Sequence, residues 1–246
     1  MPLEGVIPKT CISFEDFLMN PNRFWLKTSV LEYSIFPQLP SFCGIAACCG
    51  ALGCILHRRI TEQILHAEYQ AGLYTKLHAP ATCSPDDFAS LPRLGPGFSN
   101  WDVIRLCNAV LLDAGKQPSS VVLCGRDFVR ETEEPNQLKR ILDWLRDDSC
   151  HAIVHTINHY TLVAGVFQNS LTEDIYLLLA DSAARFGPLR SLALSNITTL
   201  AHQDERYGFV LVSDKTIPQT LFQRWTSSMT PPEVTERQRF ARIDGS

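Results

Sequence analysis

The segment Pro40-Ser41-Phe42-Cys43-Gly44-Ile45-Ala46-Ala47 decides how this chain folds, because it joins a proline-containing stretch to a long apolar run. Pro37 and Pro40 keep the preceding residues out of helical geometry. Residues 45–56 contain no proline and are rich in Ala, Leu, Ile and Cys. The pattern predicts a buried helix that begins near residues 42–44, with Cys43 at its entrance.

A cysteine at the start of a helix is in a favourable position for a nucleophile. The first turn of a helix has backbone N–H groups without intrahelical partners and carries a partial positive charge, and both lower the pKa of a thiol. Cys48, Cys49 and Cys54 lie farther along the same predicted helix. We interpret these three as small buried hydrophobic side chains, as most free cysteines are.

Length and composition indicate one enzyme-sized globular unit. The chain has 246 residues, 45% of them hydrophobic, and we expect a catalytic domain over residues 1–215 followed by a peripheral tail over residues 216–246. A net charge of -4 without a basic run argues against a nucleic-acid-binding protein.

The cysteine content and the start of the chain indicate a reducing compartment. Nine cysteines are too few for a disulfide scaffold, and an odd number cannot all be paired within one chain. The chain also begins without the pattern of a secretory signal. The apolar run at residues 42–56 is too short to span a membrane. We therefore expect a cytoplasmic protein that does not associate with membranes.

The order of predicted elements is typical of an α+β fold, with helices first and an antiparallel sheet after them. Besides the helix that begins at Cys43, the pattern predicts helices over residues 14–19, 60–73, 101–114 and 138–145. Strands are expected over residues 151–156, 160–167, 175–180 and 208–212. The segment 76–100, rich in proline and glycine, is interpreted as a loop beside the active site.

A nucleophilic thiol needs an imidazole to take its proton and a third group to orient the imidazole. His159 opens one predicted strand, and Asp181 follows the end of the next one. If Phe167 and Ile175 face each other across the hairpin loop, His159 faces residue 183 and Asp181 lies within two residues of it. Cys43, His159 and Asp181 are therefore the predicted catalytic set.

The remaining histidines and cysteines are assigned structural or surface roles. We expect His151 and His155 to be wall residues, and His57 and His66 to lie on helix surfaces. The cysteines near Cys43 form no C-x2-C pair, and Cys43 and Cys54 are about 16 Å apart by helix rise. We therefore predict no metal site and no required cofactor.

At these residues the chain resembles the phytochelatin synthase family of papain-like cysteine transpeptidases. The matching segments, within residues 30 to 214, are Phe42-Cys43-Gly44-Ile45-Ala46, residues 148–154, His159-Tyr160-Thr161, Ala180-Asp181, Ala184-Arg185-Phe186 and residues 208–213. The resemblance implies a papain-like cysteine protease fold, in which a helical lobe with a central nucleophile helix packs against an antiparallel sheet.

The resemblance also implies an activity and further site residues. A γ-glutamylcysteinyl group would pass from glutathione to Cys43 with loss of glycine, and then to a second glutathione or to water. Gln38 would donate to the oxyanion, although it stands five residues before the nucleophile rather than the family's six. Arg185, Tyr160 and Gly44 would bind substrate. Soft metals would stimulate the activity, although the cysteine-rich region of the plant enzymes is absent.

Two alternatives to glutathione chemistry stay open. The same nucleophile could use another acyl donor, such as a thioester or ester of specialised metabolism or a protein. The chain could also be a non-catalytic thiol protein that binds soft metals or a partner. The sequence leaves the oligomeric state undefined.

Overall fold

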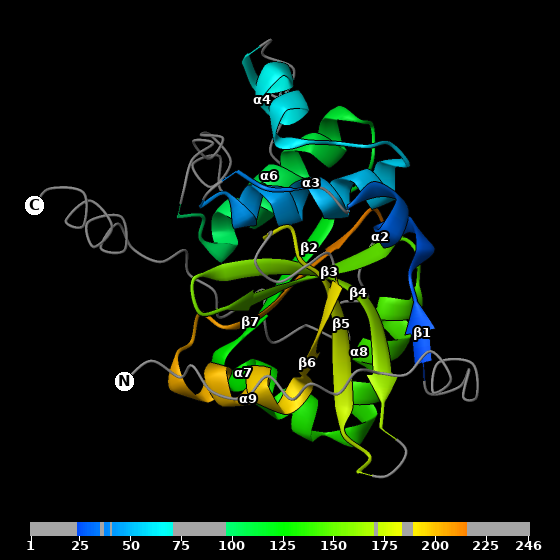
Figure 1. Ribbon diagram of the computed structural model, residues 1–246, viewed down its shortest axis with the longest axis vertical. Helices are drawn as coiled ribbons and strands as arrows, with labels where there is room; N and C mark the ends of the chain where they lie inside the picture. The colour runs from blue at the N-terminus through cyan, green and yellow to red at the C-terminus, as the bar shows by residue number, and fades with distance from the viewer. Residues whose placement is uncertain are drawn as a thin grey trace, which may run out of the picture.

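A seven-stranded antiparallel sheet with helices on both faces makes up the part of the chain described by the computed structural model (Figure 1). The structure describes residues 24–34, 37–39, 41–70, 97–169, 172–183 and 189–215. The predicted helix at 14–19, most of the predicted loop at 76–100 and the predicted tail at 216–246 lie outside these ranges.

The strands lie in the spatial order β2-β7-β3-β4-β5-β6, and β1 pairs with β4. Their bounds are β1 (Phe24–Leu26), β2 (Ser119–Cys124), β3 (Cys150–Thr156), β4 (His159–Gln168), β5 (Ile175–Ala180), β6 (Leu189–Ala193) and β7 (Gly208–Ser213). The helices are α2 (Thr28–Tyr33), α3 (Cys43–Leu56), α4 (Glu62–Gln70), α6 (Asn100–Asp113), α7 (Gly125–Glu133), α8 (Pro135–Arg146) and α9 (Leu194–Gln203).

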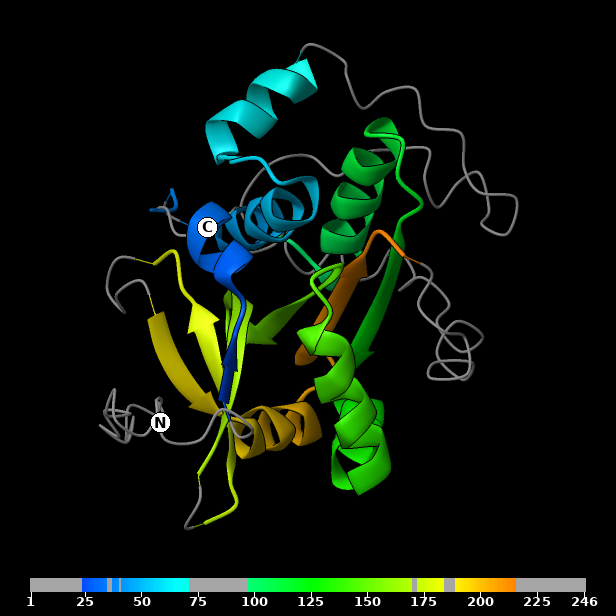
Figure 2. The same ribbon diagram turned by 90° about the vertical axis from the view of Figure 1, so that its right-hand side faces the viewer.

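Each face of the sheet has its own hydrophobic core, because successive strand side chains point to opposite faces. On β7, Val210 and Val212 pack with α3 and α6, whereas Phe209 and Leu211 pack with α7, α8 and α9. Figure 2 shows α2, α3, α4 and α6 on one side of the sheet and α7, α8 and α9 on the other. The central strands are therefore buried on both faces, which explains their continuous apolar sequence.

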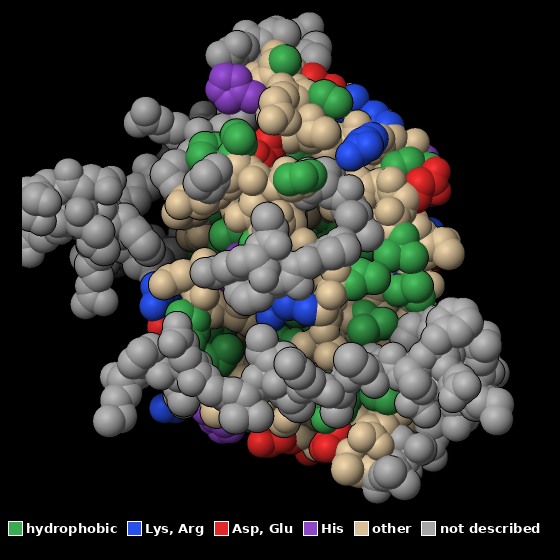
Figure 3. Space-filling view, in the orientation of Figure 1, with side chains coloured by type: hydrophobic (Ala, Val, Ile, Leu, Met, Phe, Trp, Pro, Cys, Tyr) green, Lys and Arg blue, Asp and Glu red, His purple; other side chains and the backbone are tan. Residues whose placement is uncertain are grey.

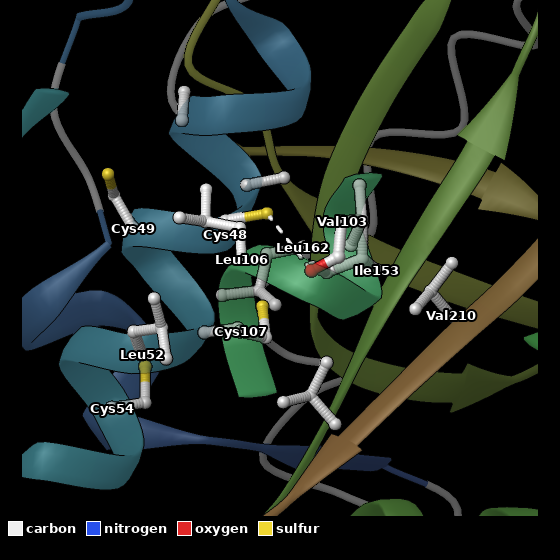
Figure 4. Packing of buried hydrophobic residues seen from close by; sticks show 14 of the residues in the cluster. Cys48, Cys49, Leu52, Cys54, Val103, Leu106, Cys107, Ile153, Leu162 and Val210 are labelled. Carbon is white, nitrogen blue, oxygen red and sulfur yellow. Dashed lines mark hydrogen bonds between the residues drawn. The ribbon is translucent and has the colours of Figure 1, made fainter. Parts of the chain in front are cut away.

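Helix α3 is confirmed where the sequence predicts it, and residues 44–55 are buried along its whole circumference. A helix that is apolar all round is stable only in a protein interior. Figure 4 shows its cysteines within the cluster formed with α6, where the Cys48 thiol donates to the Val103 carbonyl at 3.9 Å. Burial raises the pKa of Cys48 and Cys49, and that of Cys54 to about 12, so these thiols behave as small hydrophobic groups.

Other predicted elements are also confirmed. Ser99 caps α6 with a reciprocal bond to Asp102, and the four predicted strands match β3, β4, β5 and β7 within one residue at each end. The expected order of helices before strands is too simple, because β1 and β2 come early and α9 lies between β6 and β7. The sequence analysis missed β1 and α2, which have only three and six residues, and also β2, α7, β6 and α9.

The assumed register of the β4–β5 hairpin is wrong at the loop and correct at the site. Phe167 pairs with Tyr176 rather than with Ile175. An irregularity between Val163 and Gly165 then shifts the pairing by one residue, so that Leu162 pairs with Ala180. The bulge thus brings Asp181, the residue after Ala180, beside the beginning of β4, where His159 lies.

We expect Gly165→Ala to destabilise the protein, because β1 crosses this bulge at close range. A Cβ at position 165 would overlap the Trp25 carbonyl oxygen, which is backbone and cannot move aside alone. Overpacking of this kind costs about 1–3 kcal/mol. Urea denaturation followed by far-UV circular dichroism measures the loss, and an unchanged midpoint would show that β1 is not held against β4.

One face of the molecule carries side chains of mixed type. On the face seen in Figure 3, the coloured basic, acidic and hydrophobic side chains are interspersed. Within the described ranges, we find no helix with the length and apolar character needed to cross a membrane.

Candidate active site

Cys43 is the first residue of α3, and its side chain is half-buried beside the turn that joins β3 to β4. Its Sγ lies 4.0 Å from the carbonyl oxygen of Asn158 in that turn. Burial alone would raise the pKa of the Cys43 thiol, but hydrogen bonds with His159 and with backbone groups of Tyr160 and Gly44 lower it below its ordinary value. Cys43 therefore differs from the cysteines inside α3, whose pKa values burial raises.

His159 reaches Cys43 because a tight hairpin places it at the start of β4. Thr156 pairs with His159, and the turn between them includes Asn158 with φ 51°. Asparagine tolerates this left-handed conformation better than most residues. Burial alone would lower the pKa of His159, but its hydrogen bonds with Asp181 and Cys43 raise it to about 9. The two shifts favour a thiolate–imidazolium pair.

Asp181 completes the constellation from the end of β5. Its side chain is fully buried, and its Oδ1 accepts from His159 Nε2 at 2.8 Å and from the Ala183 backbone N–H at 2.9 Å. Burial would raise the pKa of this carboxyl, but these hydrogen bonds and the charges of His159 and Arg190 lower it. The structure thus brings together all three residues of the predicted catalytic set.

Arg190 is a site residue that the sequence analysis missed. It lies on β6, opposite Leu179, and its Nε donates to Asp181 Oδ2 at 2.6 Å. The sequence offers an arginine nine residues after the carboxylate but no clear strand pattern between them. Only the pairing of β6 with β5 reveals the contact.

Gln38 lies beside the segment that follows Asp181. Its backbone N–H donates to the Ser182 carbonyl at 3.1 Å, and its Oε1 accepts from the Ser182 hydroxyl at 2.6 Å. The next residue is fixed as well, because the Leu39 N–H donates to the buried Glu62 carboxylate at 3.1 Å. A side-chain amide whose oxygen is engaged presents its N–H donors on the other side. Ser182 and Glu62 are further residues that the sequence analysis missed.

The predicted substrate-binding residues have different positions. Tyr160 is buried, its hydroxyl donates to Asn100 Oδ1 at 2.9 Å, and its ring stacks on His155 at 4.0 Å between centroids. Its phenol therefore faces α6 and the core. Gly44 is also buried, and a Cβ there would lie 2.7 Å from the Phe98 Cβ, so glycine permits close packing at the helix entrance. Arg185 lies outside the described residues.

His151 and His155 lie on β3, and His57 and His66 lie at the surface as predicted. His151 is fully buried, and burial lowers its pKa to about 3. The His155 ring stacks on Tyr160, and its Nδ1 lies 2.9 Å from the Arg206 carbonyl oxygen. His57 and His66 are exposed on or beside helices. Among the residues that the structure describes, no group of three or more His, Cys, Asp or Glu side chains could hold a metal ion.

The comparisons with known proteins include a remote structural likeness. No protein-family model matches the chain, and no curated protein matches its sequence. The structure is similar to that of UfSP from C. elegans, with a TM-score of 0.36 and 10% sequence identity. The match covers 75% of this chain and 32% of that chain, so it spans about a third of UfSP.

Proposed function

We propose that this chain is a papain-like cysteine enzyme that transfers an acyl group through a thioester at Cys43. The observation that carries the proposal is the continuous line of contacts from the Cys43 thiol to His159 and on to the buried Asp181 carboxylate. Nucleophile, base and orienting group within hydrogen-bond reach are the signature of nucleophilic catalysis. A merely structural cysteine needs neither the imidazole nor the carboxylate.

The chemistry follows from the bonding of the imidazole. Since Nε2 is bonded to Asp181, Nδ1 is the nitrogen that exchanges a proton with Cys43. The thiolate attacks the acyl carbonyl, an S–C bond forms, and Nδ1 gives its proton to the leaving amine as the C–N bond breaks. The acceptor, water or an amine, then loses a proton to Nδ1 and attacks the thioester, which releases the Cys43 thiolate.

The developing oxyanion has two candidate donors in this chain. Cys43 is the first residue of α3, where backbone N–H groups have no intrahelical acceptor. Gln38 is held beside the 181–183 segment with its amide oxygen engaged by Ser182, which supports a role for its N–H group as the second donor.

For the acyl donor, the resemblance to phytochelatin synthases makes glutathione the first candidate. Incubation of the protein with glutathione should release glycine and leave a γ-glutamylcysteinyl thioester on Cys43, which mass spectrometry of the acid-quenched protein detects. Cys43→Ala is the control and should release none. Absence of glycine release by a protein whose Cys43 is reactive would exclude glutathione as donor and leave the acyl chemistry in place.

A less polar acyl donor is the second candidate, and the exposed hydrophobic side chains favour it. Leu39 adjoins Gln38 and is 43% exposed, and Ile157 lies two residues before His159 and is 53% exposed. The other large hydrophobic side chains exposed in the described ranges, Ile64 and Leu189, are within two residues of Glu62 and Arg190. Exposed apolar side chains that adjoin these residues in sequence would suit an apolar acyl chain or protein segment better than glutathione.

A further inference from the structure

The two oxygens of the Asp181 carboxylate have different hydrogen-bond partners. Oδ1 already accepts from His159 and from the Ala183 N–H. With only these partners, the positive charge on the imidazolium would offset the negative charge of the buried carboxylate during just part of the catalytic cycle. Its stability as an anion when the imidazole is neutral must come from another charge.

Arg190 supplies that charge. Its Nε lies 2.6 Å from Asp181 Oδ2, and its side chain is 21% exposed whereas that of Asp181 is fully buried. A guanidinium is positively charged at every pH of interest, and its planar fork fixes the direction of the hydrogen bond. The pairing of Leu179 with Arg190 and of Ala180 with Leu189 brings this arginine beside the end of β5.

We propose that Arg190 is a positioning residue of the active site: it keeps Asp181 ionised and fixes the carboxylate plane, so that Oδ1 stays directed at His159. The inference rests on the proposed function, since it assigns Arg190 a role in forming the thiolate–imidazolium pair. Arg190 acts on Cys43 through two intermediates and touches neither the thiol nor the reacting carbonyl.

Among the described residues, the charged groups that act most strongly on His159 and Asp181 belong to the predicted catalytic set and to Arg190. The groups that act most strongly on His159 are Asp181 from the end of β5 and Cys43 from α3. Those acting on Asp181 are His159 from β4 and Arg190 from β6, together with the Ala183 N–H of its own segment. Loss of Arg190 makes Asp181 easier to protonate, and a protonated Asp181 no longer stabilises the imidazolium. The thiolate then forms only at higher pH.

The test is the rate at which iodoacetamide alkylates Cys43 from pH 4 to pH 10, measured by mass spectrometry of the peptide that contains it. For Arg190→Gln we expect the rise of the alkylation rate with pH to occur about one pH unit higher than in the unchanged protein. At pH 5 this shift makes the alkylation of Cys43 about tenfold slower. At pH 10 the rates of variant and unchanged protein should agree. Arg190→Lys keeps the charge but loses the directed Nε, so its shift should be smaller and in the same direction.

The matched control is Arg130→Gln, which removes an arginine whose ion pair with Asp127 is on the surface of α7. It should leave the profile unchanged. Should Arg190→Gln not fold, Arg190→Lys decides the question. A variant profile that coincides with that of the unchanged protein would overturn the inference and leave Arg190 as an ion pair that stabilises β6. Slow alkylation of Cys43 in the unchanged protein would instead contradict the proposed function, and the inference with it.

Discussion

Replacement of Cys43 by alanine should abolish acyl transfer, with a loss on the order of 10³-fold or more, because the proposed thioester forms on this thiol. The same position should dominate the reaction of the folded protein with iodoacetamide. At pH 7 we expect Cys43 to be labelled at least about 100-fold faster than Cys124, since reactivity follows the thiolate fraction.

Cys124 is a suitable comparison because it is also half-buried. Burial and the nearby carboxylates of Asp127, Glu205 and Asp204 raise its pKa to about 12, whereas the pKa of Cys43 is lowered. Cys124→Ala should therefore leave both activity and labelling of Cys43 unchanged. Labelling of the two thiols at equal rates would favour the alternative hypothesis that the chain is a non-catalytic thiol protein.

The parts of the site that the sequence predicted are those encoded locally. The start of α3 at Cys43 follows from a change of composition within a few residues. The proximity of His159 and Asp181 follows from a single hairpin between consecutive strands. The predicted register of the β4–β5 hairpin nonetheless matches the structure at the site only because a bulge between Val163 and Gly165 offsets a one-residue error at the loop. The sequence around Gly165 contains no pattern that predicts this bulge.

The parts that the sequence did not predict depend on strands and segments distant in the chain. Arg190 reaches Asp181 only through the pairing of β6 with β5, and β6 has no clear alternating pattern. The substrate-binding role predicted for Tyr160 came from the family resemblance. In the structure the Tyr160 hydroxyl is bonded to Asn100 and its ring is buried, whereas the His159 ring is bonded to Asp181.

Replacement of His159 by alanine should slow the alkylation of Cys43 at pH 6 by about 10-fold to 100-fold. In the unchanged protein the lowered pKa of the thiol and the pKa of about 9 at His159 define a pH range in which the thiolate–imidazolium pair is stable. Without the imidazole, burial raises the thiol pKa and the thiolate fraction at pH 6 falls steeply. A less basic thiolate is also a weaker nucleophile, which limits the difference in rate.

The effect of His159 on the alkylation of Cys43 should diminish as the pH rises. Above about pH 9 His159 loses its proton in the unchanged protein, so the advantage over His159→Ala in alkylation should shrink and the donation of a proton to a leaving amine should fail. Acyl transfer from an amide should therefore decline above about pH 9 while alkylation of Cys43 continues. His66→Ala, at an exposed position on α4, is the control and should change neither profile. If His159→Ala alkylated at pH 6 as fast as the unchanged protein, the thiolate would owe its stability to the α3 N-terminus alone, and His159 would have no place in the mechanism.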